Sequence, residues 1–344
     1  MKAAVYRGKR NLPIEDVPKP TAKPGWVVLN VAYNGICGSD LHAYVAGEDL
    51  GMPTGITIGH EFDGTVVELG EGVTRVHEGD KVVVAPLVYC GTCYYCRRGQ
   101  YNLCEKMGFY GTSADGGLAP YVTVPQDVLF PLPSNLSLQE GALTEPLAVA
   151  YHAVRMSRLA PGESAFISGA GPIGLSAIAS AKAAGATTII VSEISTVRRQ
   201  KAEELGATHV LNPTDTDVMS AVLDLTHGLG TDVALEAAGV EAALDTALRA
   251  TRKAGRFVQI ALWGANPHVN MMMNVMKETE MRFAVGYSFV EEFPELLSLM
   301  SAGIIEPKKL ITDVISLDDV VPAGFEELLR NRDTHAKILV DVNA

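Results

Sequence analysis

The chain has 344 residues, 47% of them hydrophobic and 20% charged, which is typical of a folded globular protein and excludes a disordered one. The formal net charge is −12, and basic residues occur in runs of no more than two, which argues against a surface for nucleic acids or anionic membranes. The start lacks the apolar core of a signal peptide, and no apolar stretch is long enough to span a membrane. We therefore expect a cytoplasmic protein with a small-molecule ligand and with no nucleic-acid or membrane partner.

Residues 1 to about 145 predict short strands. Runs rich in β-branched residues cover 27–31, 64–69, 80–84 and 121–124, and glycine and proline residues lie between them. This pattern is typical of a β-barrel or sheet domain that carries metal sites on its loops.

The first group on these loops centres on Cys37, in the segment GICGSDLH. A lone cysteine is more often a buried apolar residue than a metal ligand. Here glycines flank it, His60 and Glu61 follow a turn at 53–55, and a further carboxylate, Glu145, precedes a proline. One thiolate, one imidazole and one carboxylate form an open zinc site, with a position left for water or a substrate oxygen. The segment after His60 lacks the second histidine of a metalloprotease motif, which excludes that class.

The second group consists of the remaining cysteines, which all lie within residues 90–104. Thiols spaced at i, i+3 and i+6 are too crowded for two unstrained disulfides, whereas four thiolates so close together favour a closed tetrahedral zinc site. An iron–sulfur cluster is the alternative. Because the ligands fill the coordination shell, this metal stabilises a lobe and binds no substrate. The predicted ligands are Cys90, Cys93, Cys96 and Cys104.

Near residue 146 the pattern changes to apolar strands that alternate with alanine-rich helices, which predicts βαβ units around a parallel sheet. The alternation weakens near residue 286, and we expect a helix at 293–300 and a strand at 336–340 to return to the first domain. The predicted strands and helices between these points are 164–168, 175–182, 188–192, 232–236, 242–248 and 256–261.

A Gly-x-Gly-x-x-Gly turn at 169–174 follows the first of these strands and opens a helix, as in dinucleotide-binding folds. Glu193, at the end of the next strand, is placed to accept hydrogen bonds from the adenosine ribose, and its charge would repel a 2′-phosphate. NAD is therefore favoured over NADP, although a nearby arginine could receive a phosphate. The predicted cofactor-binding residues are Gly169, Gly171, Pro172, Ile173, Gly174, Glu193 and Arg198.

Together, and in this order over nearly the whole chain, these motifs resemble those of the zinc-dependent medium-chain alcohol dehydrogenases. The segment EPLAV at 145–149 is similar to the polyol and 2,3-butanediol dehydrogenase branch, since many simple alcohol dehydrogenases have a cysteine ligand there. The segments EAAG at 236–239 and GFEELL at 324–329 are also similar to the bacterial butanediol enzymes. The stretch between His42 and His60 is shorter than in the best-known of these.

The resemblance implies a GroES-like β-barrel catalytic domain at 1–146, a Rossmann domain with a doubly wound parallel sheet at 147–286, and a return to the catalytic domain at 287–344. It also implies a homo-dimer or homo-tetramer, NAD, and two zinc ions per chain, one catalytic and one structural. The catalytic zinc would lie among Cys37, His60 and Glu145, with Glu61 as a ligand or an adjacent gate. Strand alternation would point His60 and Glu61 to opposite faces, so we favour Glu145 over Glu61.

The predicted reaction is the oxidation of a secondary alcohol or vicinal diol to the ketone, and its reverse. Ser39 would take the hydroxyl proton and His42 would pass it to solvent, unless Ser39 only caps the following helix. Asp40 would orient His60, and Trp263 would line the nicotinamide or substrate pocket or lie in the core.

Within the butanediol branch the expected substrate is (R,R)-2,3-butanediol, with acetoin as the product. Sorbitol, xylitol and L-threonine are the alternatives, because they would use the same metal and cofactor set. A remote alternative is a regulator that senses NAD without catalysis, but a DNA-binding regulator would need a basic face, and this chain is acidic.

Overall fold

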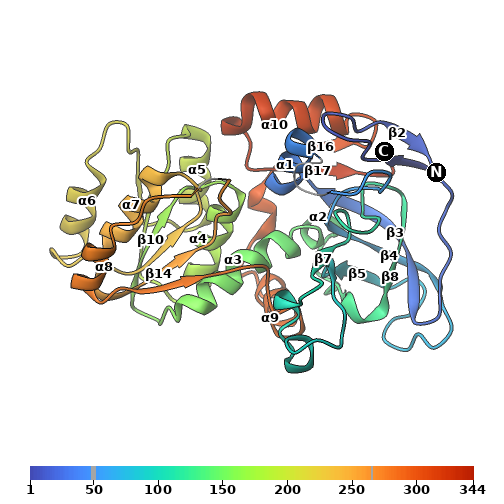
Figure 1. Cartoon of the computed structure of the whole chain (residues 1–344), viewed down its shortest axis with the longest axis horizontal. Coiled ribbons are helices and arrows are strands. Elements are labelled where there is room, and N and C mark those ends of the chain that lie inside the picture. The colour runs from blue at the N-terminus through green and yellow to red at the C-terminus, as the bar shows by residue number, and fades with distance from the viewer. Residues whose placement is uncertain (48–51, 265) are drawn as a thin grey trace. The chain divides into compact units, whose positions relative to one another are not determined.

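The computed structural model describes residues 1–47, 52–264 and 266–344. The chain divides into two compact units, both traced in Figure 1. Unit 1 comprises residues 1–145, 288–301 and 311–344, and unit 2 comprises residues 146–287 and 302–310. Residues 302–310 thus cluster with unit 2, whereas the sequence assigned all of 287–344 to the first domain.

Unit 1 is built on a largely antiparallel sheet whose strands follow the order β16-β17-β3-β4-β5-β9, with β8 paired to β3. Two small sheets, β1-β2 and β6-β7, lie outside it. The runs predicted at 27–31, 64–69, 80–84 and 121–124 are confirmed as β3, β4, β5 and β8. The strand bounds are β1 (Lys2–Ala4), β2 (Ile14–Asp16), β3 (Trp26–Gly35), β4 (Glu61–Leu69), β5 (Lys81–Val84), β6 (Leu87–Val88), β7 (Gly108–Phe109), β8 (Tyr121–Pro125), β9 (Leu129–Pro131), β16 (Ile311–Ser316) and β17 (Lys337–Asp341).

Strand β3 is the centre of this unit. It pairs with β4, β8 and β17, and Val27, Val28 and Leu29 are all fully buried although consecutive side chains point to opposite faces. Both faces of β3 are therefore covered, which explains its continuous apolar run. In Figure 1 the red C-terminal strands β16 and β17 lie beside the blue N-terminal part of the chain, as the pairing of β17 with β3 requires.

The helices of unit 1 lie at its loops and at the returning segment. They are α1 (Gly38–Ala46), α2 (Leu138–Gly141), α9 (Phe289–Ser301) and α10 (Glu326–Asn331), and α3 (Thr144–Ser157) starts at the boundary between the units. The helix predicted at 293–300 is confirmed within α9.

Unit 2 contains a parallel sheet in the order β12-β11-β10-β13-β14-β15. In chain order this is third, second, first, fourth, fifth and sixth, the arrangement of a doubly wound dinucleotide-binding fold, so the predicted fold class is confirmed. The strands are β10 (Ser164–Ser168), β11 (Thr188–Ser192), β12 (His209–Leu211), β13 (Thr231–Glu236), β14 (Thr251–Gln259) and β15 (Glu280–Phe283), and the helices are α4 (Pro172–Ala183), α5 (Thr196–Leu205), α6 (Val218–Leu225), α7 (Glu241–Ala250) and α8 (Met271–Lys277).

One row of side chains across this sheet forms the centre of its core. Phe166 is in register with Ile190 on one side and with Ala234 on the other, and Ala234 is in register with Phe257. All four are fully buried and pack against Val222 of α6 and neighbouring residues of α7. The chain order of the strands turns at β10 and β13, and ligands of such sheets bind beyond the carboxyl ends of the strands at this point.

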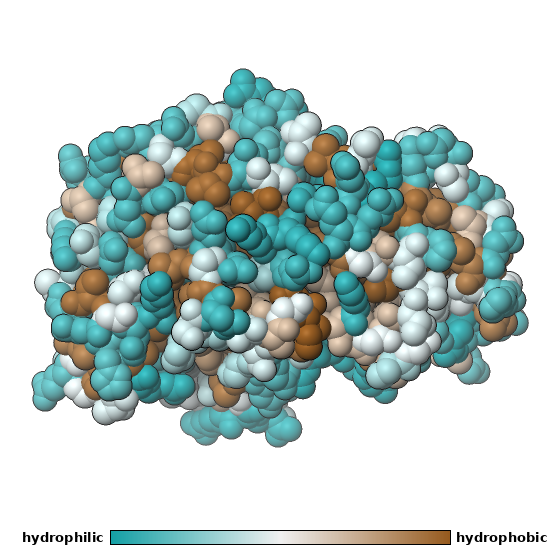
Figure 2. Space-filling view, turned by 180° about the vertical axis from the view of Figure 1, so that it is seen from behind, coloured by the Kyte–Doolittle hydropathy of each residue, from teal (hydrophilic) through white to brown (hydrophobic). Residues whose placement is uncertain are grey.

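Hydrophilic side chains cover most of the face shown in Figure 2, and hydrophobic side chains form small, separate groups on it. No helix in the described part of the chain is both long enough and apolar enough to cross a membrane.

Candidate functional site

The four cysteines of residues 90–104 form a compact cluster in unit 1. Strands β6 and β7 pair with each other, which brings the two ends of the lobe together. One sulfur atom from each cysteine lies within 4.8 Å of the other three, and the sulfur atoms of Cys90 and Cys96 are 4.0 Å apart. All are free thiols. Tetrahedral zinc with Zn–S bonds of about 2.3 Å separates its sulfur ligands by roughly 3.8 Å, so the cluster fits the predicted ion.

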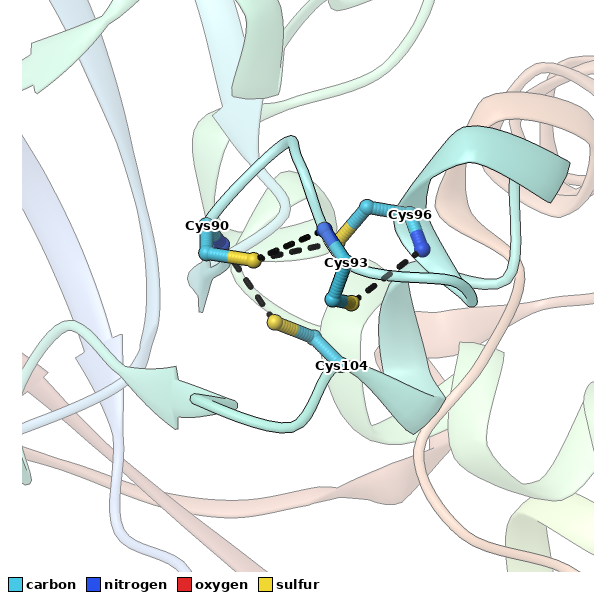
Figure 3. A group of neighbouring side chains, drawn as sticks. All are labelled: Cys90, Cys93, Cys96 and Cys104. Atoms are coloured by element: carbon cyan, nitrogen blue, oxygen red, sulfur yellow. Dashed lines mark hydrogen bonds between the residues drawn. The ribbon is translucent and has the colours of Figure 1, made fainter.

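Backbone N–H groups point at these sulfur atoms, as Figure 3 shows. The N–H of Cys93 donates to Sγ of Cys90 at 3.4 Å, and the N–H of Cys90 donates to Sγ of Cys104 at 3.3 Å. Hydrogen bonds from Thr92 and Cys93 lower the pKa of Cys90 to about 6, whereas burial raises the pKa of Cys96 to about 12. A bound cation would favour the thiolate form of every one of them.

Aromatic side chains connect this lobe to α9. The rings of Tyr89 and Tyr101 have centroids 4.5 Å apart, and Phe289 of α9 lies 5.8 Å and 5.2 Å from them. The returning C-terminal segment therefore packs directly against the cysteine lobe.

A second cluster joins Cys37, His60 and Glu61. One ligand atom from each lies within 4.8 Å of the other two. Cys37 lies between the end of β3 and the start of α1, as the N-cap residue of that helix, and its N–H donates to Oδ2 of Asp40 at 2.9 Å. The alternative that Ser39 caps the helix is therefore wrong, because Cys37 and Asp40 already make the capping interactions.

The expectation that His60 and Glu61 point to opposite faces is also wrong. Strand alternation does not apply to His60, because β4 begins only at Glu61 and Gly59 has a positive φ of 96° that turns the chain just before it. A side chain at Gly59 would also collide with Asn34, so the tight turn needs glycine. The carboxylate of Glu61 consequently reaches the same side as the imidazole.

The imidazole of His60 lies among negatively charged groups. Its Nδ1 is 3.0 Å from Oδ1 of Asp40, although the pair lacks the alignment of a hydrogen bond. Burial lowers the pKa of His60, but the charges of Asp40 and Cys37 outweigh it and hold that pKa well above its ordinary value. The cluster therefore attracts a cation, and its soft sulfur, imidazole and carboxylate donors fit zinc.

The positively charged side chain of Lys337, in β17, pairs with Glu61 of this cluster. Its Nζ lies 2.7 Å from both carboxylate oxygens of Glu61, and both side chains are almost completely buried. Burial lowers the pKa of Lys337, but the charges of Glu61, Cys37 and Glu145 raise it above its ordinary value.

Glu145, in the first turn of α3, is buried and acts electrostatically on Lys337, but among the described residues it is not part of the group with Cys37 and His60. The two relay candidates lie on α1. Ser39 is half-buried and His42 is exposed, and their spacing of three residues places them on one side of the helix.

In unit 2 the glycine-rich turn lies where β10 meets α4. Gly169 has a φ of 90°, Gly171 is the N-cap of α4, and Pro172 occupies its first turn. Glu193 is buried at the end of β11 and accepts hydrogen bonds from the N–H of Ala170 at 2.6 Å and of Ser195 at 2.8 Å. The carboxylate of Glu193 thus connects the glycine-rich turn to the end of β11 through hydrogen bonds.

The other cofactor candidates lie beside these residues. Ile173 follows Pro172 in α4 and is half-buried. Arg198 lies in the first turn of α5, where its N–H donates to Oγ of Ser195. Trp263 packs against the sheet core around Phe166, which agrees with the alternative that it is a core residue.

Sequence reasoning missed Lys337 and the pair of Glu236 and Gln259. Glu236, fully buried at the end of β13, accepts hydrogen bonds from two backbone N–H groups and from Nε2 of Gln259 at 2.6 Å. The available signal was the same for Lys337 and Glu236: a charged residue directly next to an apolar run of a strand, which must have a partner when it is buried.

Comparison with known proteins places this geometry in a family. The model of the alcohol dehydrogenase GroES-like domain matches residues 23–134, and the model of the zinc-binding dehydrogenase matches residues 172–302. The chain is 43% identical to (R,R)-butanediol dehydrogenase of Bacillus subtilis (strain 168) over 356 aligned residues, which cover all of both chains.

The chain belongs to the zinc-dependent medium-chain alcohol dehydrogenases. It is also 36% identical to sorbitol dehydrogenase of the same organism, over all of this chain and 98% of that one. The crystal structure of 2R,3R-butanediol dehydrogenase from Bacillus subtilis superposes with a TM-score of 0.92 at 41% identity, and the match covers 99% of each chain. The enzyme is thus an oxidoreductase whose substrate is a small alcohol or diol.

Proposed function

We propose that this alcohol dehydrogenase oxidises a secondary alcohol or vicinal diol to the ketone with zinc and NAD, and that its substrate is (R,R)-2,3-butanediol, with acetoin as the product. The observation that carries the reaction type is the convergence of Cys37, His60 and Glu61 within 4.8 Å of one another. The similarity at 43% identity to (R,R)-butanediol dehydrogenase over both full lengths supports the substrate.

In this proposal Cys37, His60 and a carboxylate from Glu61 or Glu145 hold a catalytic zinc, and the four cysteines of residues 90–104 hold a structural one. A bound zinc supplies Lewis acidity toward the alcohol oxygen, and NAD accepts the hydride. The carboxylate of Asp40, 3.0 Å from Nδ1 of His60, would orient the imidazole through its charge and leave Nε2 for the metal.

The proton of the substrate hydroxyl must reach water, and α1 offers a short route. Ser39 is half-buried and would accept the proton, and His42 is exposed and would release it to solvent. An imidazole can both accept and donate a proton, which suits a group that passes protons to solvent.

For the cofactor, we propose that the turn at 169–174 holds the pyrophosphate and that Glu193 and Arg198 lie at the adenosine end. The carboxylate of Glu193 already accepts two backbone hydrogen bonds, so its position is preorganised. A carboxylate there would accept bonds from ribose hydroxyls and repel a 2′-phosphate, which supports NAD over NADP.

We further propose that unit 1 is the catalytic domain and unit 2 the NAD-binding domain, that the protein is cytoplasmic, and that it forms a homo-dimer or homo-tetramer. Exposed apolar side chains on α8 and on the edge strand β15 support an assembly, because single surface residues need no partner but a group of them does. These side chains, each 61% to 71% exposed, are Met271, Met272, Val275, Met276 and Phe283.

A polyol is the second candidate substrate. The 36% identity to sorbitol dehydrogenase over the full chain favours it, and sorbitol or xylitol would use the same metal and cofactor. The two candidates differ only in the side chains that line the substrate position.

The decisive experiment is the initial rate of NADH formation from NAD with (R,R)-2,3-butanediol, sorbitol, xylitol and L-threonine in parallel, with NADP as the cofactor control. The proposal requires the highest kcat/KM for the butanediol. A higher value for a sugar alcohol or threonine would keep the mechanism and replace the substrate.

The variant Cys37→Ser tests whether turnover depends on the proposed catalytic metal site. It should lose turnover with every substrate while it still binds NADH, because Cys37 belongs to unit 1 and the glycine-rich turn belongs to unit 2. Full activity in this variant would contradict the proposed catalytic metal.

A further inference from the structure

Two buried polar side chains lie at the carboxyl ends of adjacent strands in unit 2, and neither takes part in the proposed reaction. Glu236 is the last residue of β13 and Gln259 is the last residue of β14, and they are 0% and 9% exposed. The Nε2 of Gln259 donates to Oε2 of Glu236 at 2.6 Å. Burial removes both groups from water, which is tolerated only when protein atoms satisfy their hydrogen bonds.

The carboxylate of Glu236 holds the loop that follows β13. Its Oε1 accepts hydrogen bonds from the backbone N–H groups of Ala238 and Gly239, both at 2.8 Å. Gly239 has a positive φ of 70°, a conformation that glycine adopts without strain. Any movement of loop 237–240 away from Glu236 would leave a buried carboxylate without these donors, which is costly.

The amide of Gln259 connects the same carboxylate to the loop that follows β14. Its Nε2 also donates to the carbonyl oxygen of Ala261 at 2.9 Å, so both amide hydrogens are used. The backbone N–H groups of Ile260 and Ala261 donate to the carbonyl oxygen of Glu236 at 2.9 and 3.1 Å. Glu236 and Gln259 therefore fix loops 237–240 and 260–262 relative to each other.

The other half of the sheet has an equivalent arrangement. There Glu193, buried at the end of β11, accepts a hydrogen bond from the N–H of Ala170 in the glycine-rich turn. A doubly wound fold consists of two mononucleotide-binding halves, and a dinucleotide lies across both. Since the turn at 169–174 and Glu193 are proposed to hold the pyrophosphate and the adenosine, the half with β13 and β14 is left for the nicotinamide nucleotide.

Loops 237–240 and 260–262 also expose apolar side chains at this end of the sheet. Val240 is 52% exposed and Leu262 is 75% exposed. Ligands of such sheets bind beyond the carboxyl ends of the strands, so apolar side chains in these loops suit a ligand with a flat ring.

We propose that Glu236 and Gln259 are positioning residues for the nicotinamide half of the cofactor, because their hydrogen bonds fix the two loops on which that half rests. This inference rests on the proposed function. It assigns neither side chain a contact with the cofactor; both act through the backbone of loops 237–240 and 260–262.

The test compares the binding of NADH and of ADP to the intact enzyme by titration calorimetry. ADP contains the adenosine and the pyrophosphate but lacks the nicotinamide nucleotide. In Glu236→Gln the side chain keeps its size, but its new NH₂ group must face either the backbone N–H groups or the amide of Gln259, which are donors as well. NADH affinity should fall by about tenfold, the scale of lost buried hydrogen bonds to a charged group, whereas ADP affinity should stay within about twofold of the wild type.

Asp232→Asn is the matched control. Asp232 lies near the opposite, amino end of β13 and pairs with Arg252. Its replacement removes a carboxylate from the same strand without disturbing the two loops, so Tm should fall while both affinities stay at the wild-type values.

Gln259→Met carries the test if Glu236→Gln does not fold. It removes the amide donors but leaves the bonds from Glu236 to Ala238 and Gly239, so NADH affinity should fall by only about threefold, again with ADP affinity unchanged.

Wild-type NADH affinity in a folded variant of Glu236 or Gln259 would overturn the inference. Equal losses for NADH and ADP would also overturn it, because that result indicates a general disturbance of unit 2. A wild-type enzyme that binds neither ligand would instead overturn the proposed dinucleotide site, and the inference with it. The two failures are therefore distinguishable.

Discussion

Two glycines of the turn at 169–174 are expected to have different roles: Gly174 allows helix α4 to pack closely, and Gly171 allows the cofactor to approach the backbone. Replacing each of them by alanine tests this difference. In Gly174→Ala the new Cβ would lie 2.9 Å from the carbonyl carbon of Gly169, nearer still to its oxygen, and 3.6 Å from Cβ of Ala237. Carbon atoms prefer separations of about 3.5–4.0 Å, so α4 must move away from the turn by roughly 1 Å.

That movement is resisted by the packing of α4. Leu175, Ala177 and Ile178 of this helix are fully buried against the rest of unit 2. Overpacking of this kind costs about 1–3 kcal/mol. For a unit of this size each kcal/mol lowers Tm by about 2–4 °C. The displaced helix N-terminus should also weaken NADH binding by at least about tenfold, which corresponds to ~1.4 kcal/mol.

Gly171→Ala is the matched control. Gly171 has φ −63° and ψ −179°, which alanine adopts without strain, and no described atom lies within 4 Å of the added Cβ. Its Tm should stay equal or rise slightly, because alanine restricts the unfolded chain. Its NADH affinity should nevertheless fall, because the new methyl group occupies the approach of the pyrophosphate to the backbone.

The assay combines differential scanning calorimetry with titration of NADH fluorescence. A Gly174→Ala protein with wild-type Tm and affinity would show that the turn opens freely, and the packing argument would fail. Loss of stability in Gly171→Ala as large as in Gly174→Ala would refute the division of roles between the two glycines.

Two further predictions concern stability. Cys93→Ser should destabilise unit 1 by roughly 4 kcal/mol or more, the range expected when a structural metal is lost, and a chelator should lower the Tm of the wild type but leave that of the variant unchanged. Equal chelator sensitivity of the two proteins would count against a metal in the lobe. Burial raises the pKa of Asp232, but hydrogen bonds from Ser164 and the pairing with Arg252 at 2.8 Å outweigh it and hold that pKa below its ordinary value. Asp232 therefore stabilises the fold above the unfolded pKa of about 3.9, and this contribution disappears as the pH falls through the folded pKa. Urea midpoints of Asp232→Asn and wild type should differ at pH 7, and the difference should shrink as the pH falls below about 3.9. A difference that does not change with pH would disprove the mechanism.

Features that depend on local spacing could be predicted from the sequence. The cysteines of residues 90–104 lie within one short segment, so only a tight loop can contain them, and the structure brings all four sulfur atoms together. The turn at 169–174 is similarly local, because the glycines, the strand before it and the helix after it are continuous in the chain. Alternation of apolar strands with helices allows few arrangements other than a doubly wound parallel sheet.

The relation of Glu61 and Glu145 to Cys37 could not be predicted in this way. Both follow Cys37 in the chain and both are carboxylates, so spacing alone does not rank them. The positive φ of Gly59 decided that Glu61 turns toward His60, and a single dihedral angle of this kind leaves no periodic pattern.

The contact between Lys337 and Glu61 was even harder to predict from the sequence, because 276 positions separate the two residues. The partner of Lys337 depends on the pairing of β17 with β3, which is a long-range event selected by the packing of the whole unit. The sequence by itself determined the fold class, the cysteine cluster, the glycine-rich turn and the residue types available for a metal, since these follow from local spacing and periodicity. Only the tertiary structure decided which carboxylate joins Cys37 and His60 and which cation opposes it, because buried charges are matched by strands that meet only after the chain has folded.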